Sequence, residues 1–302
     1  MSANNVTLRQ LRYFVAAARS GQFSMAATSE NVSQSAITNA VLALEKELGV
    51  RLFERLAQGV SLTADGEDFF QHACHILDSV HDATHKPRFR SRELSGTVRI
   101  AASYTVLGYF LPDLLARFRA SYPEVEIDLR DMDRAEIEQA VLGGDVDLGV
   151  AILSNIPKLS RFAHAVLVRS RRQLWVAPGH PLAKIPRPSL KDIAAHPYIM
   201  VTTDEAELST LAYWKSRRIK PDIVFRTSSI EAVRGLVAHG FGVTALSDMV
   251  FRPWSLEGKR IEARPILDLV PPMEVGALWH PQRSMSTPAE TFQQFLLHAY
   301  GY

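Results

Sequence analysis

Apolar residues recur at helical spacing over the first fifty positions, in three short stretches separated by polar residues or glycine. Gly21 is expected to end the first helix, since glycine readily adopts the left-handed conformation found there. Ser24 stands where the cap of a second helix is expected, and residues 30–33 predict a tight turn. Ser33 would cap a third helix that ends at Gly49. Two short helices joined by such a turn are typical of a helix-turn-helix.

The third helix would leave short hydrogen-bonding side chains outward on its first two turns. Such groups suit phosphates and base edges in a major groove, although an isolated helix with this pattern is more simply a solvated amphipathic helix. The candidate DNA-binding residues of this helix and its cap are Ser33, Gln34, Ser35, Thr38 and Asn39. Two alternating segments around Gly59 predict a hairpin, and hence a winged helix-turn-helix over residues 1–62. Arg55 and Gln58 on this wing would lie near the DNA backbone.

Residues 63–92 are expected to form a linker helix and a hinge. Thr63 would cap the helix, with Asp65 favourably placed in its first turn. Apolar positions spaced four, three, four and three predict a short coiled-coil seam for dimerisation, made of Phe69, Ala73, Ile76, Val80 and Ala83. Two copies would present two recognition helices, so the DNA target would be an inverted repeat. Histidines on the same helix spread around its solvent side, and we predict no metal site there.

Strands alternate with helices from Ser95 onward, which predicts an α/β fold with open sheets. A strand over 97–102, a helix over 107–120 and a strand over 146–151 begin this pattern. The effector domain, residues 93–302, would divide into lobe I, about 93–165 and 266–302, and lobe II, about 166–265. Two lobes crossed twice by the chain form a hinged clamp, with a ligand held between them at the carboxyl ends of the strands.

Hydroxyl side chains follow strands in both lobes. Turns of this kind bring hydroxyls and free N–H groups to a place where a small anion could bind, although many such hydroxyls only cap a helix. The candidate effector-binding residues are Ser103, Tyr104 and Thr105 in lobe I, and Thr202, Thr203 and Ser228 in lobe II. Asp145 and Asp147 resemble a catalytic carboxylate pair, but they alternate across a strand start and are expected to cap and solvate it.

Composition excludes several classes of protein. A chain of 302 residues, 47% hydrophobic and 22% charged, fits about two globular domains. The single Cys74 excludes an internal disulfide, and we find no GxSxG, P-loop, HExxH or dinucleotide motif of an enzyme. The polar N-terminus and the absence of a long apolar run predict a cytoplasmic protein without a membrane anchor. The net charge of +2 does not indicate a partner, so DNA binding rests on local pattern.

Several motifs together resemble the LysR-type transcriptional regulators. The most specific ones lie in residues 8–14, 24–27, 32–36, 44–55 and 62–66, and weaker ones lie in residues 144–148, 178–182 and 237–243. The resemblance implies a winged helix-turn-helix, a dimerising linker helix and a two-lobed, periplasmic-binding-protein-like α/β effector domain. It implies double-stranded DNA and a small-molecule effector as partners, with RNA polymerase as a further candidate, and a homodimer or homotetramer without a cofactor. It also favours Ser103 and Thr202 as ligand contacts.

Three departures from the family pattern are informative. Residues 38–40 read Thr-Asn-Ala where the family often has Ser-Arg-Gln, and Ser247 stands where proline is common. Asp133 and Arg134 replace small hydroxyl residues, which argues against a simple carboxylate effector. The lobes alone would also fit a cytoplasmic small-molecule-binding protein or an enzyme on a solute-binding scaffold. The N-terminal 62 residues argue against that alternative.

Overall fold

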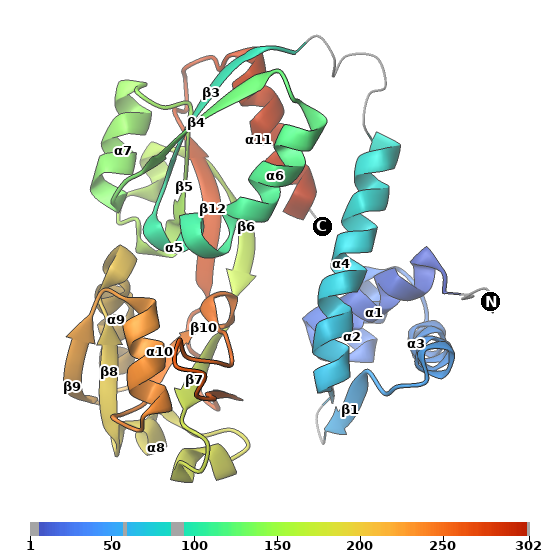
Figure 1. Ribbon diagram of the computed structural model, residues 1–302, viewed down its shortest axis with the longest axis vertical. Helices are drawn as coiled ribbons and strands as arrows, with labels where there is room; N and C mark the ends of the chain where they lie inside the picture. Colours follow the sequence, from blue (N-terminus) through green and yellow to red (C-terminus); the bar gives the residue numbers. More distant parts are fainter. Residues whose placement is uncertain (1–5, 57–58, 86–93, 301–302) are drawn as a thin grey trace. The chain divides into compact units, whose positions relative to one another are not determined.

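The computed structural model describes residues 6–56, 59–85 and 94–300, which fall into two compact units, residues 1–88 and 89–302 (Figure 1). Each unit has its own hydrophobic core. No helix in the described ranges is both long and apolar enough to cross a membrane.

The N-terminal unit is a helix-turn-helix with a two-stranded wing and a long following helix. Its elements are α1 (Leu8–Ser20), α2 (Phe23–Ser29), α3 (Gln34–Leu48), β1 (Phe53–Leu56), β2 (Gly59–Leu62) and α4 (Ala64–His85). Gly21 and Gly49 end α1 and α3 in the left-handed conformation, and the Ser33 hydroxyl accepts the Ala36 amide at 3.2 Å, which confirms these three predictions. Thr63 likewise caps α4 by accepting the Gly66 amide at 2.9 Å.

The second helix begins earlier than its polar residues suggested. Gln22, rather than Ser24, is the N-cap of α2, so the prediction for Ser24 was wrong. Phe23 is already helical and its ring packs edge-on against Phe53 of the wing at 5.5 Å. Packing of Phe23 against the wing therefore determines where the helix starts, and the pattern of capping residues in the sequence does not reveal such a contact.

Phe14 organises the core of the N-terminal unit. Its fully buried ring contacts the rings of Phe53, Phe69 and Phe70, so α1 holds both the wing and the first turns of α4. The Glu45 carboxylate of α3 accepts the amides of Leu52 and Phe53 at 2.7 and 3.0 Å, and so anchors the wing to the third helix. The position of the wing beside α3 is therefore fixed by both apolar packing and a side-chain carboxylate.

Lobe I of the C-terminal unit is a five-stranded sheet in the order β4-β3-β5-β12-β6 (Figure 1). The first three strands in this order are parallel, and β12 runs antiparallel to β5 and β6. Helices α6 and α11 cover one face and α7 the other. The elements are β3 (Gly96–Ala102), α5 (Tyr104–Tyr109), α6 (Leu111–Ser121), β4 (Val125–Asp131), α7 (Arg134–Gly143), β5 (Leu148–Ile152), η1 (Leu153–Asn155), η2 (Leu159–Arg161), β6 (Ala163–Ser170), β12 (Met273–Trp279) and α11 (Thr287–Tyr300).

The single helix expected over residues 107–120 is two helices. The break lies at Phe110, between α5 and α6, and Pro112 stands in the first turn of α6. Proline lacks an amide hydrogen and its ring clashes with the carbonyl one turn before it, so a helix cannot run through this position undisturbed. The short α5 thereby becomes a separate element, directly after the first strand of the sheet.

Lobe II contains an antiparallel sheet in the order β10-β7-β11 and a parallel pair, β8 and β9. Its core includes the buried aromatic side chains of Trp175, Tyr198 and Trp214. The elements are β7 (Arg172–Val176), η3 (Pro181–Lys184), α8 (Leu190–Ala194), β8 (Pro197–Val201), η4 (Thr203–Glu205), α9 (Ala206–Ser216), β9 (Asp222–Thr227), α10 (Ile230–Ala238), β10 (Thr244–Ser247), η5 (Asp248–Val250) and β11 (Glu262–Pro265).

The chain crosses from lobe I to lobe II slightly later than the sequence suggested. β6 stays paired with β12 as far as Ser170, so lobe I extends past residue 165 and the crossing lies between Ser170 and Arg172. The Ser170 hydroxyl bonds to the side chains of Ser247 and Asp248, and it accepts the Met249 amide at 3.1 Å. Ser247, a departure from the family pattern, thus contacts the first crossing of the chain from within lobe II.

Candidate DNA-binding surface and effector site

The first turns of α3 expose two amide side chains, Gln34 and Asn39, that make no hydrogen bond within the described residues. Thr38 is half-buried and donates its hydroxyl to the Gln34 carbonyl at 2.9 Å. The Ser35 hydroxyl bonds to that of the capping Ser33 at 2.9 Å. The five sequence candidates on this helix therefore divide into two unengaged amides and three hydroxyls that already have a partner.

The charge of the N-terminal unit is nearly balanced. Residues 1–62 hold six Lys and Arg against four Asp and Glu, a net charge of 6 − 4 = +2. One of these cations, Arg12, pairs with Glu30 at 2.7 Å. Arg55 lies in β1, but its side chain, like the whole of Gln58, lies outside the described residues.

The apolar positions of α4 face two directions. Ala73 is completely buried and the ring of Phe69 contacts Phe14 at 5.2 Å, so these two side chains are engaged within their own domain. Ile76 is 41% exposed, Val80 is half-buried and the side chain of Ala83 lies outside the described residues. The apolar positions deduced from spacing therefore include residues that pack inside the domain and a residue that faces outward. Spacing does not separate them, because both kinds recur with the period of the helix.

Lobe I places its candidate effector residues at the turn from β3 into α5. Ser103 is the N-cap of α5 and is only 2% exposed, yet its buried hydroxyl has no hydrogen-bond partner within the described residues. Thr105 is also buried, and its backbone amide donates to the carboxylate of Asp204 at 2.9 Å. Tyr104, between them, is exposed. Because Asp204 belongs to lobe II, the two lobes meet directly at this turn.

Lobe II contributes the turn after β8, as the sequence suggested. Thr202 is half-buried and donates its amide to the Thr227 carbonyl at 3.0 Å. The Thr203 hydroxyl donates to the carbonyl of the exposed Ser228. The hydroxyl of Ser229 caps α10 by accepting the Ala232 amide at 3.1 Å. Thr203 and Ser228 are thus joined to each other, next to the acidic residues that contact lobe I.

Sequence reasoning missed the polar side chains that join the lobes. Asn155 of lobe I donates to the Asp204 carbonyl at 2.5 Å, and Arg134 pairs with Glu205 at 2.9 Å. The available signal was the acidic pair Asp204-Glu205 three residues after the end of a buried strand, on the side where parallel strands present ligand sites. Asp133, one of the departures from the family pattern, caps α7 by accepting the Glu136 amide.

Two regions of the chain match known protein families. Residues 8–67 match the bacterial regulatory helix-turn-helix protein of the lysR family, and residues 91–301 match the LysR substrate binding domain. The chain belongs to the LysR family. It is therefore a DNA-binding transcriptional regulator with an effector-binding domain, and the reading as a solute-binding protein is not needed to explain its lobes.

Individual relatives of this LysR-family regulator span almost its whole length. The HTH-type transcriptional regulator YnfL of Escherichia coli (strain K12) is 29% identical over 304 residues, with 98% of this chain and 99% of YnfL covered. CysB of Haemophilus influenzae is 30% identical, covering 80% of this chain and 76% of CysB. The crystal structure of HinK, a LysR family regulator from Pseudomonas aeruginosa, aligns with a TM-score of 0.63 at 27% identity over 97% of this chain and 98% of HinK.

A second polar network joins the lobes of the regulator near the other end of α5. Tyr109 donates to Glu231 at 3.1 Å, and Glu231 pairs with Arg234, whose side chain is only 3% exposed. Arg234 also donates to the Val250 carbonyl at 3.0 Å and lies over the Trp175 ring. The hydrogen bond from Arg234 lowers the pKa of Glu231, and burial raises the pKa of the Tyr109 hydroxyl.

The lowered pKa of Glu231 predicts how acid affects stability. An acid whose pKa is lower in the folded state stabilises the fold above its unfolded pKa, and this contribution is lost as pH falls through the folded pKa. We expect Glu231→Gln to remove about 1 kcal/mol or less, the range of partly exposed ion pairs, and to flatten the fall in unfolding free energy below about pH 4.5. Urea unfolding at several pH values measures it, with the exposed Glu124→Gln as control. Equal acid sensitivity of wild type and Glu231→Gln would contradict the assignment.

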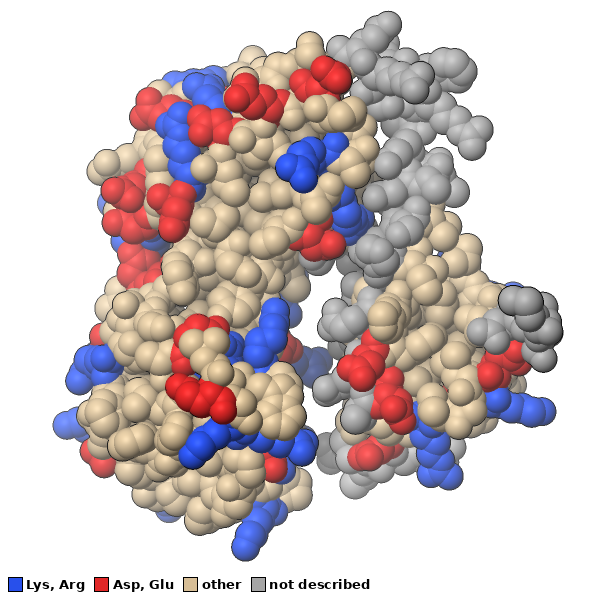
Figure 2. Space-filling view, in the orientation of Figure 1, with Lys and Arg blue, Asp and Glu red and all other residues tan. Residues whose placement is uncertain are grey.

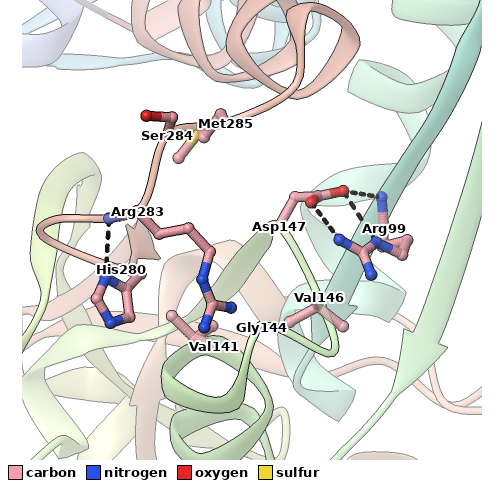
Figure 3. Close-up of a pocket in the computed structure, with 9 residues that line it drawn as sticks. All are labelled: Arg99, Val141, Gly144, Val146, Asp147, His280, Arg283, Ser284 and Met285. Atoms are coloured by element: carbon pink, nitrogen blue, oxygen red, sulfur yellow. Dashed lines mark hydrogen bonds and ion pairs between the residues drawn. The ribbon is translucent and has the colours of Figure 1, made fainter.

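A small hollow of lobe I lies beside Val146 and Asp147, directly before β5 (Figure 3). Arg99 pairs with Asp147 at 2.7 Å along one wall, so Asp147 ties β3 to β5, where the sequence suggested only capping and solvation. The Arg283 side chain crosses Gly144, where a Cβ would lie 1.2 Å from the guanidinium. The volume of about 20 Å³ is enough for a water molecule but not for a metabolite.

Charges are mixed on the face of the effector domain seen in Figure 2. Lys and Arg lie beside Asp and Glu on both lobes, and the surface between the lobes is largely uncharged. In the described part of the chain, no group of three His, Cys, Asp or Glu side chains is arranged to hold a metal ion.

Proposed function

We propose that this regulator binds an inverted-repeat operator as a homodimer, with α3 in the major groove of each half-site. The observation that carries this proposal is the pair of exposed, unengaged amides of Gln34 and Asn39 on the first two turns of α3. Asparagine and glutamine side chains pair in a bidentate way with adenine edges, so these two residues are the proposed base readers. Ser33, Ser35 and Thr38 would contact phosphates or support the two amides, and Arg55 and Gln58 would reach the backbone from the wing.

The dimer contact is proposed for the outward side of α4. Ile76 is 41% exposed and Val80 is half-buried on this helix. Ala83 follows about two turns after Ile76, and Phe69 and Ala73 are engaged within the domain. A tetramer would be built from two such dimers, and RNA polymerase is a further proposed partner.

The effector is proposed to bind where the turn after β3 meets the turn after β8. Ser103 offers a buried hydroxyl without a partner, and Thr105 offers a backbone amide. Thr202, Thr203, Tyr104 and Ser228 border the same place. A small molecule bound there would change the equilibrium between lobe arrangements, and with it the spacing of the DNA-binding domains. Such a protein would act on DNA in the cytoplasm and would regulate transcription without catalysing a reaction.

Fluorescence anisotropy tests the regulator directly. DNA from immediately upstream of the gene for this protein is compared with shuffled DNA over a salt series. We expect tight binding to the native fragment that persists at salt concentrations where the shuffled fragment is released. The small net charge of the N-terminal unit predicts a shallow salt dependence for each module. Identical, salt-sensitive binding to both fragments would contradict an operator at this position.

Replacing Ser103 tests the buried hydroxyl. Ser103→Ala removes a buried polar group that has no partner, so the unfolding free energy should stay the same or rise by about 1 kcal/mol. Ser121→Ala is the matched control, because the Ser121 hydroxyl is buried and donates to the Arg117 carbonyl at 2.9 Å. This control should lose about 1 kcal/mol in urea unfolding. An equal loss in both variants would show that Ser103 has a partner in solution.

A further inference from the structure

Helix α5 of lobe I is held at both ends by acidic side chains of lobe II. At its start, the Asp204 carboxylate accepts the backbone amide of Thr105 at 2.9 Å. At its end, the Glu231 carboxylate accepts the hydroxyl of Tyr109 at 3.1 Å. The amide of Thr105 lies in the first turn, where a helix offers no carbonyl of its own to the N–H group. Its hydrogen bond is therefore supplied entirely by the other lobe.

The turn that carries Asp204 is in an unfavourable backbone conformation. Asp204 and Glu205 are consecutive left-handed residues, with φ of 51° and 54°. For residues other than glycine this conformation costs on the order of 1 kcal/mol each, so the surroundings must maintain it. Two contacts from lobe I do so: Asn155 donates to the Asp204 carbonyl and Arg134 pairs with Glu205. The left-handed conformation of Asp204 and Glu205 therefore depends on contact with lobe I.

Three buried polar atoms at the same turn have no hydrogen-bond partner in the described part of the chain. They are the Ser103 hydroxyl, the Asn155 side-chain oxygen and one oxygen of Glu205. Ser103 lies two residues before Thr105, Glu205 follows Asp204, and Asn155 bonds to the Asp204 carbonyl. The contact between the lobes thus gives the Thr105 amide a hydrogen bond but leaves neighbouring polar groups without one. A ligand that forms hydrogen bonds with these groups as well would be favoured over the Asp204 carboxylate.

We propose that residues 203–205 form a latch, in which the Asp204 carboxylate occupies the Thr105 amide and holds the two lobes together in the absence of a ligand. The latch itself rests on the contacts within the effector domain. Its regulatory consequence rests on the proposed function: an effector that reaches Ser103 and Thr105 must displace Asp204 and bring a hydrogen-bond acceptor of its own.

Hydrogen exchange on the full-length chain tests the latch without DNA or effector. Asp204→Gly removes the carboxylate and also relieves the left-handed strain, so we expect the Thr105 amide to exchange at least roughly tenfold faster. Asp204→Asn is the matched variant, because asparagine tolerates the left-handed conformation and keeps an acceptor oxygen. It should retain the protection. Fast exchange in the wild type, or protection that survives Asp204→Gly, would overturn the proposal.

A distance measurement tests whether the latch holds the lobes together. Spin labels on Arg119→Cys in α6 and Lys191→Cys in α8, two exposed positions, report the separation of the lobes. Cys74→Ala removes the native cysteine, and the labelled chain is diluted with unlabelled chain. Asp204→Gly should broaden the distance distribution, and Asp204→Asn should not. An unchanged distribution in Asp204→Gly would overturn the role as a latch. Operator binding, measured separately by anisotropy, reports the proposed function, so the two can fail independently.

Discussion

Replacing Gln34 and Asn39 together with alanine should weaken binding to the operator by roughly 2–6 kcal/mol, at about 1–3 kcal/mol for each lost base contact. This corresponds to at least about a 30-fold loss of affinity. The fold should be unaffected, since both side chains are exposed and bond to nothing in the described structure. Binding to shuffled DNA should change little, because phosphate contacts dominate non-specific affinity.

Fluorescence anisotropy on operator and shuffled fragments measures both effects. Gln282→Ala with Gln294→Ala is the control, because it removes two exposed amides from lobe I and leaves α3 intact. The single variant Thr38→Ala, measured in the same way, tests whether the half-buried Thr38 hydroxyl takes part in recognition, since it already bonds to the Gln34 carbonyl. If the double variant of α3 discriminates between operator and shuffled DNA as well as the wild type does, these amides are not the base readers.

The largest loss of stability is expected from Arg234→Ala, at about 2–5 kcal/mol, the range for truncating a large buried side chain to alanine. Arg234 is almost completely buried, bonds to Glu231 and to the Val250 carbonyl, and lies over Trp175. Alanine would remove all three contacts and leave a cavity. Arg234→Met should lose less, because it keeps the packing of the side-chain stem and Glu231 is partly open to solvent.

Urea unfolding of the full chain measures the difference. Arg226→Ala provides the control in the same lobe, since Arg226 pairs with Glu207 at 3.0 Å but is 55% exposed. That pair should contribute no more than about 1 kcal/mol. Similar losses for Arg226→Ala and Arg234→Ala would show that burial does not govern the contribution of Arg234.

The N-terminal unit could be predicted from sequence almost element by element. Its helices end at Gly21 and Gly49 and begin at Ser33 and Thr63 because these signals act within one turn of backbone. The misplaced start of α2 has the opposite origin, since Phe23 is fixed by a ring 30 positions further along the chain. The broken helix at Phe110 was predictable, because Pro112 stands within the expected span.

The candidate effector site was predictable only in part. Strand-to-helix turns locate Ser103 and Thr202 from local pattern, but which acidic residue meets the Thr105 amide depends on how two lobes close on each other. The same limit applies to α4. Its apolar residues recur with one helical period, but Phe69 packs in the core around Phe14 whereas Ile76 faces outward. Spacing identifies the apolar positions without saying which partner covers each of them.

By itself, the sequence determined that this protein is a LysR-type regulator with a winged helix-turn-helix and a two-lobed effector domain. The helix-turn-helix and the α/β lobes follow from caps, glycines and apolar periods, which act over a few residues of the chain, and the family follows from the resemblance of its motifs. The tertiary structure alone decided that Asp204 bonds to Thr105, that the buried Arg234 lies over Trp175 and that the Ser103 hydroxyl has no hydrogen-bond partner among the described residues. These contacts join residues up to about a hundred positions apart, and only the packing of complete lobes brings their atoms within bonding distance.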